Sequence, residues 1–243
     1  MRPDIRLLRE AMEATWPPAR RFNYECWTIR EGLGGGKRVS AATLRGNWNA
    51  ENPDAAVSQM AGLGQRPLFM VWEGEDPLDN ALAELGYRQV DPVNAYACAL
   101  RSLPKVEISV PAMAVWEPLA VQLDIWRDGN IGAERIEVMR RVKGLKTSFL
   151  GRCGNSPAAT LFVAIHNDIS IIHALQVRDG FRRAGMGRHL TLAAARWAER
   201  RGAKYLSVLC TTANEGANAL YDSLGMKIAD RYHYRIKEET RLK

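Results

Sequence analysis

Cysteine is scarce in this sequence, and long hydrophobic runs do not occur in it. Its 243 residues include four cysteines, which lie far apart and form no C-x-x-C pair. That spacing excludes the usual zinc patterns and a dense disulfide framework. No stretch approaches the roughly 18 consecutive apolar residues of a membrane span, and the first residues hold an early acid with no apolar run behind them. We therefore expect no membrane span, signal peptide or membrane partner, and a reducing cytoplasm as the compartment.

The charge of the chain is unevenly distributed. Lysine and arginine exceed aspartate and glutamate by 34 − 27 = 7, in an otherwise ordinary globular composition with 47% hydrophobic residues. An excess of positive charge that is concentrated in one segment predicts attraction of that segment to a polyanion, either a nucleic acid backbone or a phosphorylated small molecule. Most of it falls between residues 178 and 204, where only Asp179 and Glu199 are acidic and the eight cations are Arg178, Arg182, Arg183, Arg188, Arg196, Arg200, Arg201 and Lys204.

The first hundred residues mix helical and extended patterns. Two extended runs, 24–29 and 39–44, flank the glycine-rich segment 32–37 and predict a hairpin. That segment lacks the G-K-[ST] ending of a phosphate loop, and no helix pattern follows it, which favours a structural role. Apolar spacing and turn signals predict helices over 7–12, 55–63 and 78–85, and strands over 68–72 and 96–100.

The rest of the chain has a denser strand pattern. A boundary is expected between Pro104 and Pro111, which divides the chain into segments 1–104 and 105–243. Residues 78–87 can be laid on 217–226, each after a short apolar strand, which indicates a weak internal repeat. The pattern predicts helices over 118–126, 133–142, 184–201 and 214–224, and strands over 147–152, 158–165, 169–177, 205–210 and 227–236.

One turn carries the strongest chemical signal. After the strand ending at Val177, a basic segment leads to Gly185 and Gly187 at the start of a helix. Backbone N–H groups at a helix start have no intrahelical acceptor, glycine permits close approach, and the helix dipole favours negative charge there. This turn therefore predicts a site for a pyrophosphate.

A second motif follows one strand later. The first motif reads R-x-x-G-x-G from Arg182 to Gly187, and the second reads N-x-x-A-x-x-L-Y-x-x-L-G-M from Asn214 to Met226. In this order and spacing they resemble the acetyl-CoA signatures of the GNAT N-acetyltransferase superfamily. The match covers roughly residues 118–236, and the joint occurrence of both motifs is more specific than either one.

The resemblance implies a fold. It is an α/β fold with a mixed, largely antiparallel central sheet flanked by helices, present as two similar units in tandem. Residues 105–243 would be the catalytic GNAT domain. Residues 1–104 would be a degenerate GNAT-like unit, because Leu82 stands where the second motif has Tyr221 and no R-x-x-G-x-G precedes its strand.

The resemblance also implies roles for individual residues. The strand before the turn would offer backbone groups to the pantetheine arm of acetyl-CoA, through Leu175, Gln176 and Val177. Asn214 would contact the cofactor. Tyr221 would protonate the leaving CoA thiolate, and a phenol, with a reference pKa of about 10, keeps the proton that this role needs. The pyrophosphate would be held by Arg182, Arg183, Ala184, Gly185, Met186, Gly187 and Arg188.

The general base is less clearly marked. Many relatives carry a glutamate on the strand before the turn, at positions that match Ile171 or His173 here. His173 is the available candidate, since an imidazole can accept a proton at neutral pH. A purely structural histidine and a water chain to the surface remain the alternatives.

We therefore predict an enzyme that moves an acetyl group from acetyl-CoA to a primary amine, by direct attack in a ternary complex. The acceptor would be a small-molecule or peptide amine; aminoglycoside, amino acid, polyamine and protein N-terminus all stay open, as does a homodimer. No metal and no nucleic acid partner are expected. Two other classes compete: a catalytically silent acyl-CoA-binding or regulatory module, and a nucleic-acid-binding protein that uses the basic helix.

Overall fold

A computed structural model describes residues 2–49, 53–105 and 112–237 of the chain, and these residues form two compact units. Unit 1 holds residues 2–17, 95–105, 112–210 and 214–229, and unit 2 holds 18–49, 53–94, 211–213 and 230–237. Both units are therefore discontinuous in sequence. They interleave the two segments, 1–104 and 105–243, that the sequence analysis separates.

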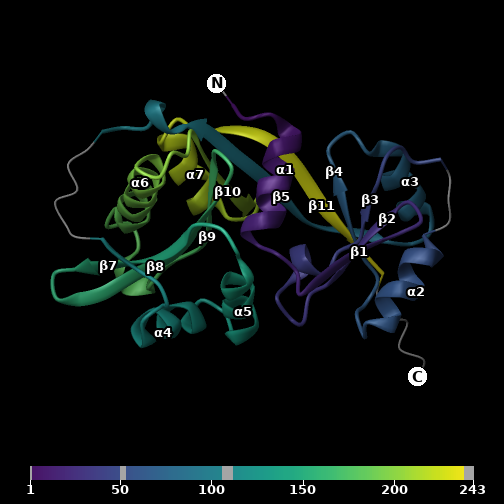
Figure 1. Cartoon of the computed structure of the whole chain (residues 1–243), viewed down its shortest axis with the longest axis horizontal. Helices are drawn as coiled ribbons and strands as arrows, with labels where there is room; N and C mark the ends of the chain where they lie inside the picture. Colours follow the sequence, from purple (N-terminus) through teal and green to yellow (C-terminus); the bar gives the residue numbers. More distant parts are fainter. Residues whose placement is uncertain (1, 50–52, 106–111, 238–243) are drawn as a thin grey trace. The chain divides into compact units, whose positions relative to one another are not determined.

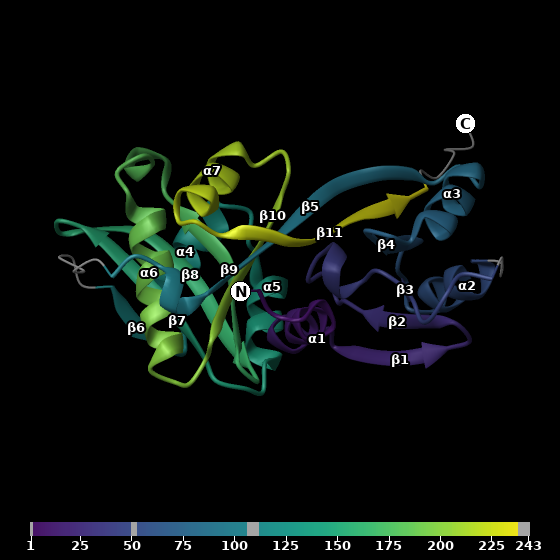
Figure 2. The same cartoon turned by 90° about the horizontal axis from the view of Figure 1, so that it is seen from above.

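The elements are labelled in Figures 1 and 2. Strands β5 (Arg88–Ala99) and β11 (Lys227–Ile236) each contain residues of both units, and Thr211, the last residue of β10, also belongs to unit 2. Unit 2 otherwise contains β1 (Arg20–Tyr24), β2 (Trp27–Glu31), the 3₁₀ turn η1 (Lys37–Val39), β3 (Thr43–Leu44), α2 (Asp54–Gly62), β4 (Leu68–Trp72) and α3 (Asp76–Glu84). Unit 1 contains α1 (Ile5–Thr15), η2 (Leu100–Ser102), β6 (Met113–Val115), α4 (Ala120–Asp128), α5 (Ala133–Arg141), β7 (Lys146–Cys153), β8 (Ser156–His166), β9 (Ile169–Val177), η3 (Asp179–Phe181), α6 (Met186–Glu199), β10 (Tyr205–Thr211) and α7 (Glu215–Ser223).

The sheet of unit 1 is mostly antiparallel. Its strands are hydrogen-bonded in the order β5-β10-β9-β8-β7-β6. The pairs β6–β7, β7–β8 and β8–β9 are antiparallel, whereas β9 and β10 run parallel. The predicted fold class, a mixed α/β fold with a largely antiparallel sheet flanked by helices, is confirmed. So are the five strands predicted after residue 146, to within a few residues.

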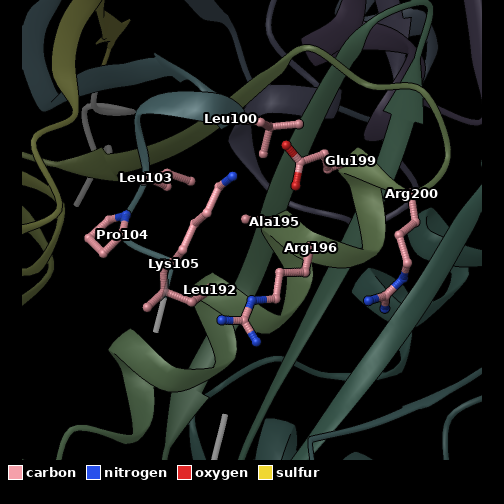
Figure 3. Close-up of a pocket in the computed structure, with 9 residues that line it drawn as sticks. All are labelled: Leu100, Leu103, Pro104, Lys105, Leu192, Ala195, Arg196, Glu199 and Arg200. Carbon is pink, nitrogen blue, oxygen red and sulfur yellow. The ribbon is translucent and has the colours of Figure 1, made fainter. Parts of the chain in front are cut away.

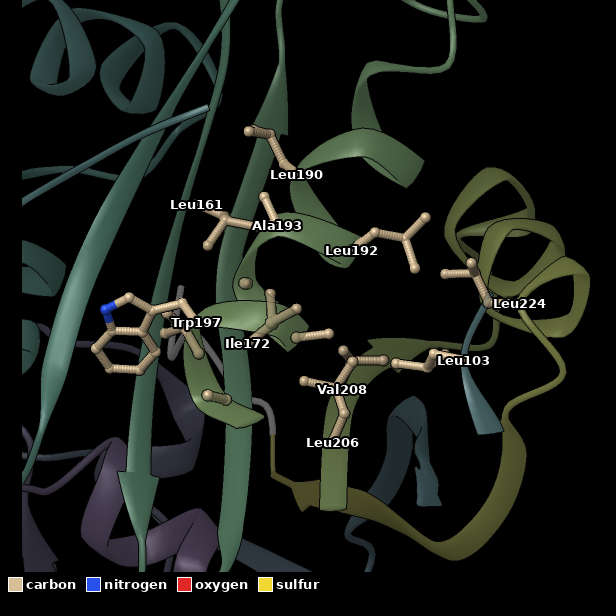
Figure 4. Packing of buried hydrophobic residues seen from close by; sticks show 14 of the residues in the cluster. Leu103, Leu161, Ile172, Leu190, Leu192, Ala193, Trp197, Leu206, Val208 and Leu224 are labelled. Atoms are coloured by element: carbon tan, nitrogen blue, oxygen red, sulfur yellow. The ribbon is translucent and has the colours of Figure 1, made fainter. Parts of the chain in front are cut away.

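Helix α6 covers one face of this sheet. It packs against β7, β8 and β9. Figure 4 shows Leu190, Ala193 and Trp197 of α6 lying beside Leu161 of β8 and Ile172 of β9. Large side chains on the strands and alanines on the helix let the two backbones approach closely, so this layer fixes where α6 begins relative to the end of β9.

Helices α1 and α4 cover the opposite face of the sheet. Side chains alternate along a strand, so Phe162 of β8 points to the face opposite Leu161. Both helices contact β8 and β9. The ring of Phe162 lies 6.3 Å from that of Trp16, directly after α1. Helix α1 therefore belongs to unit 1, although its sequence lies in the segment 1–104 that was predicted to form the degenerate unit.

In unit 2, the glycine-rich segment 32–37 lies between two antiparallel strands, β2 and β3, as the sequence predicts, with Trp27 opposite Leu44 and Thr28 opposite Thr43. A second turn, which the sequence analysis did not predict, comes before it. That turn is Glu25-Cys26, between the antiparallel strands β1 and β2, and Glu25 takes a positive φ of 50° there. The prediction of one strand over 24–29 was wrong, because an unmarked two-residue turn interrupts it. The glycine segment joins β2 to η1, and β3 follows η1.

The two segments of the predicted weak repeat, 78–87 and 217–226, share the same local geometry where their helices end. Gly86 and Gly225 end α3 and α7 with positive φ values of 83° and 76°. The amide after each glycine returns to the equivalent carbonyl: Tyr87 N donates to Leu82 O at 2.9 Å and Met226 N donates to Tyr221 O at 3.1 Å. This is a left-handed helix end of the Schellman type. It places Leu82 and Tyr221 at matching positions of matching helices.

Two further observations complete the fold. Among the helices of the described ranges, none has the length and apolarity that crossing a membrane requires. Residues 106–111, on which most of the predicted boundary falls, lie outside the residues that the structure describes.

Candidate active site

The basic turn leads directly into α6, as the sequence predicts. Gly185 is the N-cap residue of α6, and no side chain caps the helix start. The first intrahelical bond runs from His189 N to Gly185 O at 2.9 Å. The amides of residues 186–188 therefore lack an intrahelical acceptor, and among the described residues no hydrogen bond from them is recorded. Together with the helix dipole they form a positive site for an anion.

The two glycines of this turn have different roles. Gly185 has a φ of +78°, and a Cβ there would meet nothing within 4 Å, so glycine satisfies the left-handed backbone at an open position. A Cβ on Gly187 would come within 3.2 Å of Leu220 Cδ2 and 3.8 Å of Leu175 Cδ2. Gly187 therefore allows α6 to begin close to α7 and β9.

Arginines surround the start of α6. Arg182 pairs with Asp179 at 2.8 Å, and Arg183 has a positive φ of 61°, which is unusual for a residue with a Cβ. Ala184 is exposed, and Met186 is buried in the core beneath the turn. Unusual backbone at a polar, exposed turn is typical of binding sites.

Not all of the predicted basic cluster lies at this turn. Arg196 and Arg200 belong to the last part of α6, roughly 15–20 Å along the helix from Met186. With Lys105 they surround a separate hollow of about 370 Å³ that has an apolar floor (Figure 3). The floor is formed by Leu100, Leu103, Leu192 and Ala195.

Strands β9 and β10 separate next to the turn. Their parallel ladder runs from Ile169 opposite Tyr205 to Ile172 opposite Val208, and no further pair is formed in the described part of these strands. The rest of β9, which contains Leu175, Gln176 and Val177, pairs only with β8. Its other edge carries backbone groups that an extended ligand can pair with, as in peptide strand addition.

A bulge at Ala174 bends β9 where the strands separate. The register between β8 and β9 shifts between Thr160 and Phe162, and Ala174 has a φ of +53°. The indole Nε1 of Trp126 donates to the carbonyl of Ala174 at 2.7 Å. Helix α4 therefore holds the bulge, and the sequence analysis did not identify Trp126, because its partner lies 48 residues away.

Tyr221 lies buried on α7, 4% exposed. Burial raises the pKa of its phenol well above the ordinary value of 10, and the nearby Cys210 raises the pKa further. Desolvation disfavours the phenolate, so the hydroxyl keeps its proton at neutral pH. The ring lies 5.7 Å from that of Tyr96, centroid to centroid.

Asn218 connects Tyr96 to α7. Tyr96 Oη donates to Asn218 Oδ1 at 3.1 Å, and Asn218 Nδ2 donates to the carbonyl of Asn214 at 2.7 Å. Asn218 follows Asn214 by four residues on the same helix face, a spacing that could have indicated it in the sequence. Tyr96 comes from β5 and has no local signal.

The structure places Asn214 at the N-cap of α7, where its Oδ1 accepts a hydrogen bond from Ala217 N at 3.1 Å. This bond supplies a structural reason for an asparagine at the start of the second motif. The residue as a whole is exposed.

His173 lies 5% exposed beneath α1. Its Nε2 is 3.0 Å from the hydroxyl of Thr15, which donates its single proton to Ala11 O at 2.7 Å. The Thr15 oxygen therefore accepts from His173, which places a proton on Nε2. The ring also stacks 4.9 Å from that of Trp16.

Comparisons with known proteins agree with this fold. Residues 149–236, which contain the turn and α7, match the FR47-like protein family. A GCN5-related N-acetyltransferase from Kribbella flavida superposes with a TM-score of 0.71 at 17% identity, over 97% of this chain and 96% of that one. This chain has the GNAT fold. The resemblance seen in the two sequence motifs is thereby confirmed.

Two further solved structures match over most of the chain. A tandem GNAT protein from the clavulanic acid biosynthesis pathway matches with a TM-score of 0.57 at 14% identity, over 80% of this chain and 74% of that one. A functionally unknown conserved protein from Staphylococcus epidermidis matches with a TM-score of 0.67 at 9% identity, over 92% and 95%. No curated protein matches the sequence.

Proposed function

We propose that this protein is an N-acetyltransferase that moves an acetyl group from acetyl-CoA to a primary amine. The observation that carries the proposal is the basic, uncapped start of α6 beside the separating ends of β9 and β10. A helix start binds a pyrophosphate, and an unpaired strand edge binds an extended amide chain. Acetyl-CoA contains both parts, a pyrophosphate and, attached to it, the extended amide-containing pantetheine arm.

The chemistry follows from the residues at this site. The amine nitrogen attacks the thioester carbonyl, the new C–N bond forms, and the C–S bond breaks. Tyr221 gives its proton to the leaving sulfur, which avoids a free thiolate. The amine loses its extra proton to His173 or to water. The reaction needs no covalent acyl-enzyme, since the amine attacks the thioester directly. Cys210 is a poor candidate for such an intermediate, because burial raises the pKa of its thiol to about 11 and so disfavours the reactive thiolate.

Calorimetric titration with acetyl-CoA tests the binding site. Arg188→Glu should weaken binding by roughly 10- to 100-fold, because it replaces a charge-assisted contact with repulsion. Arg188 is preferred to Gly185, where any side chain would strain the positive φ. Arg200→Glu makes the same charge change at the C-terminal end of α6 and should leave the affinity for acetyl-CoA nearly unchanged. A folded wild type that does not bind acetyl-CoA would refute the proposal.

His173→Gln tests the proposed base. The glutamine amide can still donate to Thr15, so the packing under α1 is kept, while proton acceptance is lost. We expect kcat to fall by about 10²-fold and the acidic limb of the pH–rate profile to disappear. An unchanged profile would assign the base to water and leave His173 a structural role.

We place the reaction in the cytoplasm. The four cysteines are free thiols, and Cys153 is exposed. An exposed free thiol persists most readily in a reducing compartment.

A further inference from the structure

Unit 2 contains a hollow of about 810 Å³ that the proposed reaction does not use. Pockets for small molecules are typically about 300–1,000 Å³, so this volume suits a ligand of nucleotide size. The walls come from the glycine segment after β2, the residues leading into β4 and β5, and the end of β11. They are Gly34, Gly36, Lys37, Ser40, Gln65, Arg66, Pro67, Leu68, Arg88, Ile236 and Lys237.

The charge of this hollow has one sign. Four of the lining residues are cations, Lys37, Arg66, Arg88 and Lys237, and no acidic side chain lines it among the described residues. Lys37 forms an ion pair with Asp91, outside the lining, and the ammonium of Lys237 lies 5.4 Å from the centre of the Tyr87 ring. Several cations around one concave surface produce a positive potential that concentrates anions.

The glycine segment is held in place by Gln65. Its Oε1 accepts a hydrogen bond from Gly32 N at 2.6 Å, and its Nε2 donates to the carbonyl of Arg30 at 2.8 Å. The same Nε2 also donates to the carbonyl of Ser40 at 3.4 Å. Because one side chain bonds both ends of the segment between β2 and Ser40, the wall is formed before any ligand arrives. A preformed site loses less entropy on binding.

Glycines at the wall leave the backbone accessible. Gly34 and Gly36 have positive φ values of 78° and 101°, a conformation that residues with a Cβ rarely adopt. Without side chains at these positions, a ligand can approach the main chain closely. Glycine backbone beside arginine and lysine is a combination that suits phosphate groups.

We propose that this hollow binds a phosphorylated small molecule, independently of acetyl-CoA at unit 1. The guanidinium groups of Arg66 and Arg88 would each offer a planar pair of donors to phosphate oxygens. Lys37 and Lys237 would add point charges from the other walls. A carboxylate group offers fewer acceptor oxygens to these cations than a phosphate group does, so a phosphorylated ligand should bind more tightly than a carboxylate ligand.

Titration of the full chain with inorganic pyrophosphate, followed by ¹H–¹⁵N NMR, tests this proposal. The amide signals of Gly34 and Gly36 should shift, and Arg66→Glu should raise the half-saturating concentration by roughly tenfold or more. Arg66→Gln is the milder variant and should raise it less. Arg45→Glu is the matched control, because it makes the same change at an exposed position of unit 2 outside the lining.

The NMR titration distinguishes pyrophosphate binding in this hollow from pyrophosphate binding at the proposed acetyl-CoA turn of unit 1. Pyrophosphate bound at the proposed acetyl-CoA turn shifts the Gly185 amide instead, so the two sites are read from different signals. Absence of shifts at Gly34 and Gly36 overturns the inference, as does equal weakening by Arg66→Glu and Arg45→Glu, which would indicate general attraction to a basic surface. Equal affinity for citrate and pyrophosphate overturns the assignment to phosphate.

Discussion

Replacing Tyr221 by phenylalanine should lower kcat for acetyl transfer by about 10²- to 10³-fold and leave the affinity for acetyl-CoA unchanged. Phenylalanine keeps the ring that packs 5.7 Å from Tyr96, so α7 keeps its position. Only the hydroxyl is lost, and with it the proton for the leaving thiolate. The pKa of this phenol, raised by burial, means that the hydroxyl stays protonated across the accessible pH range.

The measurement is the rate of thiol release from acetyl-CoA in the presence of an amine acceptor, with affinity determined separately by calorimetry. Tyr205→Phe is the matched control, since it removes a hydroxyl from the opposite end of β10. Full turnover by a folded Tyr221→Phe variant would contradict the assigned role. A wild type that binds acetyl-CoA but shows no turnover with any amine would favour the silent binding module instead.

Asp79→Asn should destabilise unit 2 by about 3 kcal/mol at neutral pH. The Asp79 carboxylate accepts two hydrogen bonds from Arg235, both at 2.7 Å, and a third from His233 Nε2 at 2.6 Å. The side chains of Arg235 and Asp79 are 11% and 23% exposed, so the variant leaves a largely buried guanidinium without its anion. These bonds hold β11 against α3.

Urea denaturation followed by tryptophan fluorescence measures this loss, and the exposed Glu84 on the same helix supplies the control, Glu84→Gln. The hydrogen bonds from Arg235 are the main cause that lowers the pKa of Asp79 below its ordinary 3.8. The stabilisation is therefore fully present above pH 3.8 and is lost as the pH falls through the lower folded-state pKa. The difference between wild type and Asp79→Asn should shrink in strong acid, and a constant difference would refute this account.

The sequence predicted the elements of unit 1 well because their signals are local. Short apolar runs bounded by turn residues mark β7, β8 and β9, and Gly225 marks the end of α7, so their order and bounds required no knowledge of distant contacts. In unit 2 the turn at Glu25-Cys26 carries none of the usual turn residues. The pattern therefore predicted the pairing of β2 with β3 across the glycine segment and missed the hairpin of β1 with β2 that precedes it.

The same distinction applies to the candidate site. Motif residues such as Gly185 and Tyr221 lie in short sequence patterns, and the structure places Gly185 at the start of α6 and Tyr221 on α7. Trp126 and Tyr96 were missed because their roles depend on partners far away in the chain, whereas Asn218 could have been found from its spacing of four residues from Asn214. Tyr96 and Asn218, for example, are separated by 122 residues.

The link between Thr15 and His173 spans 158 residues and has a consequence for how the protein is made. Helix α1 leaves the ribosome early, yet the strands that receive it are synthesised much later. Loop closure of this length slows folding, and the apolar side of α1, including Leu8 and Met12, lacks its strand partners until β8 and β9 are made. During translation this first helix therefore depends on later parts of the chain, or on a chaperone, for cover.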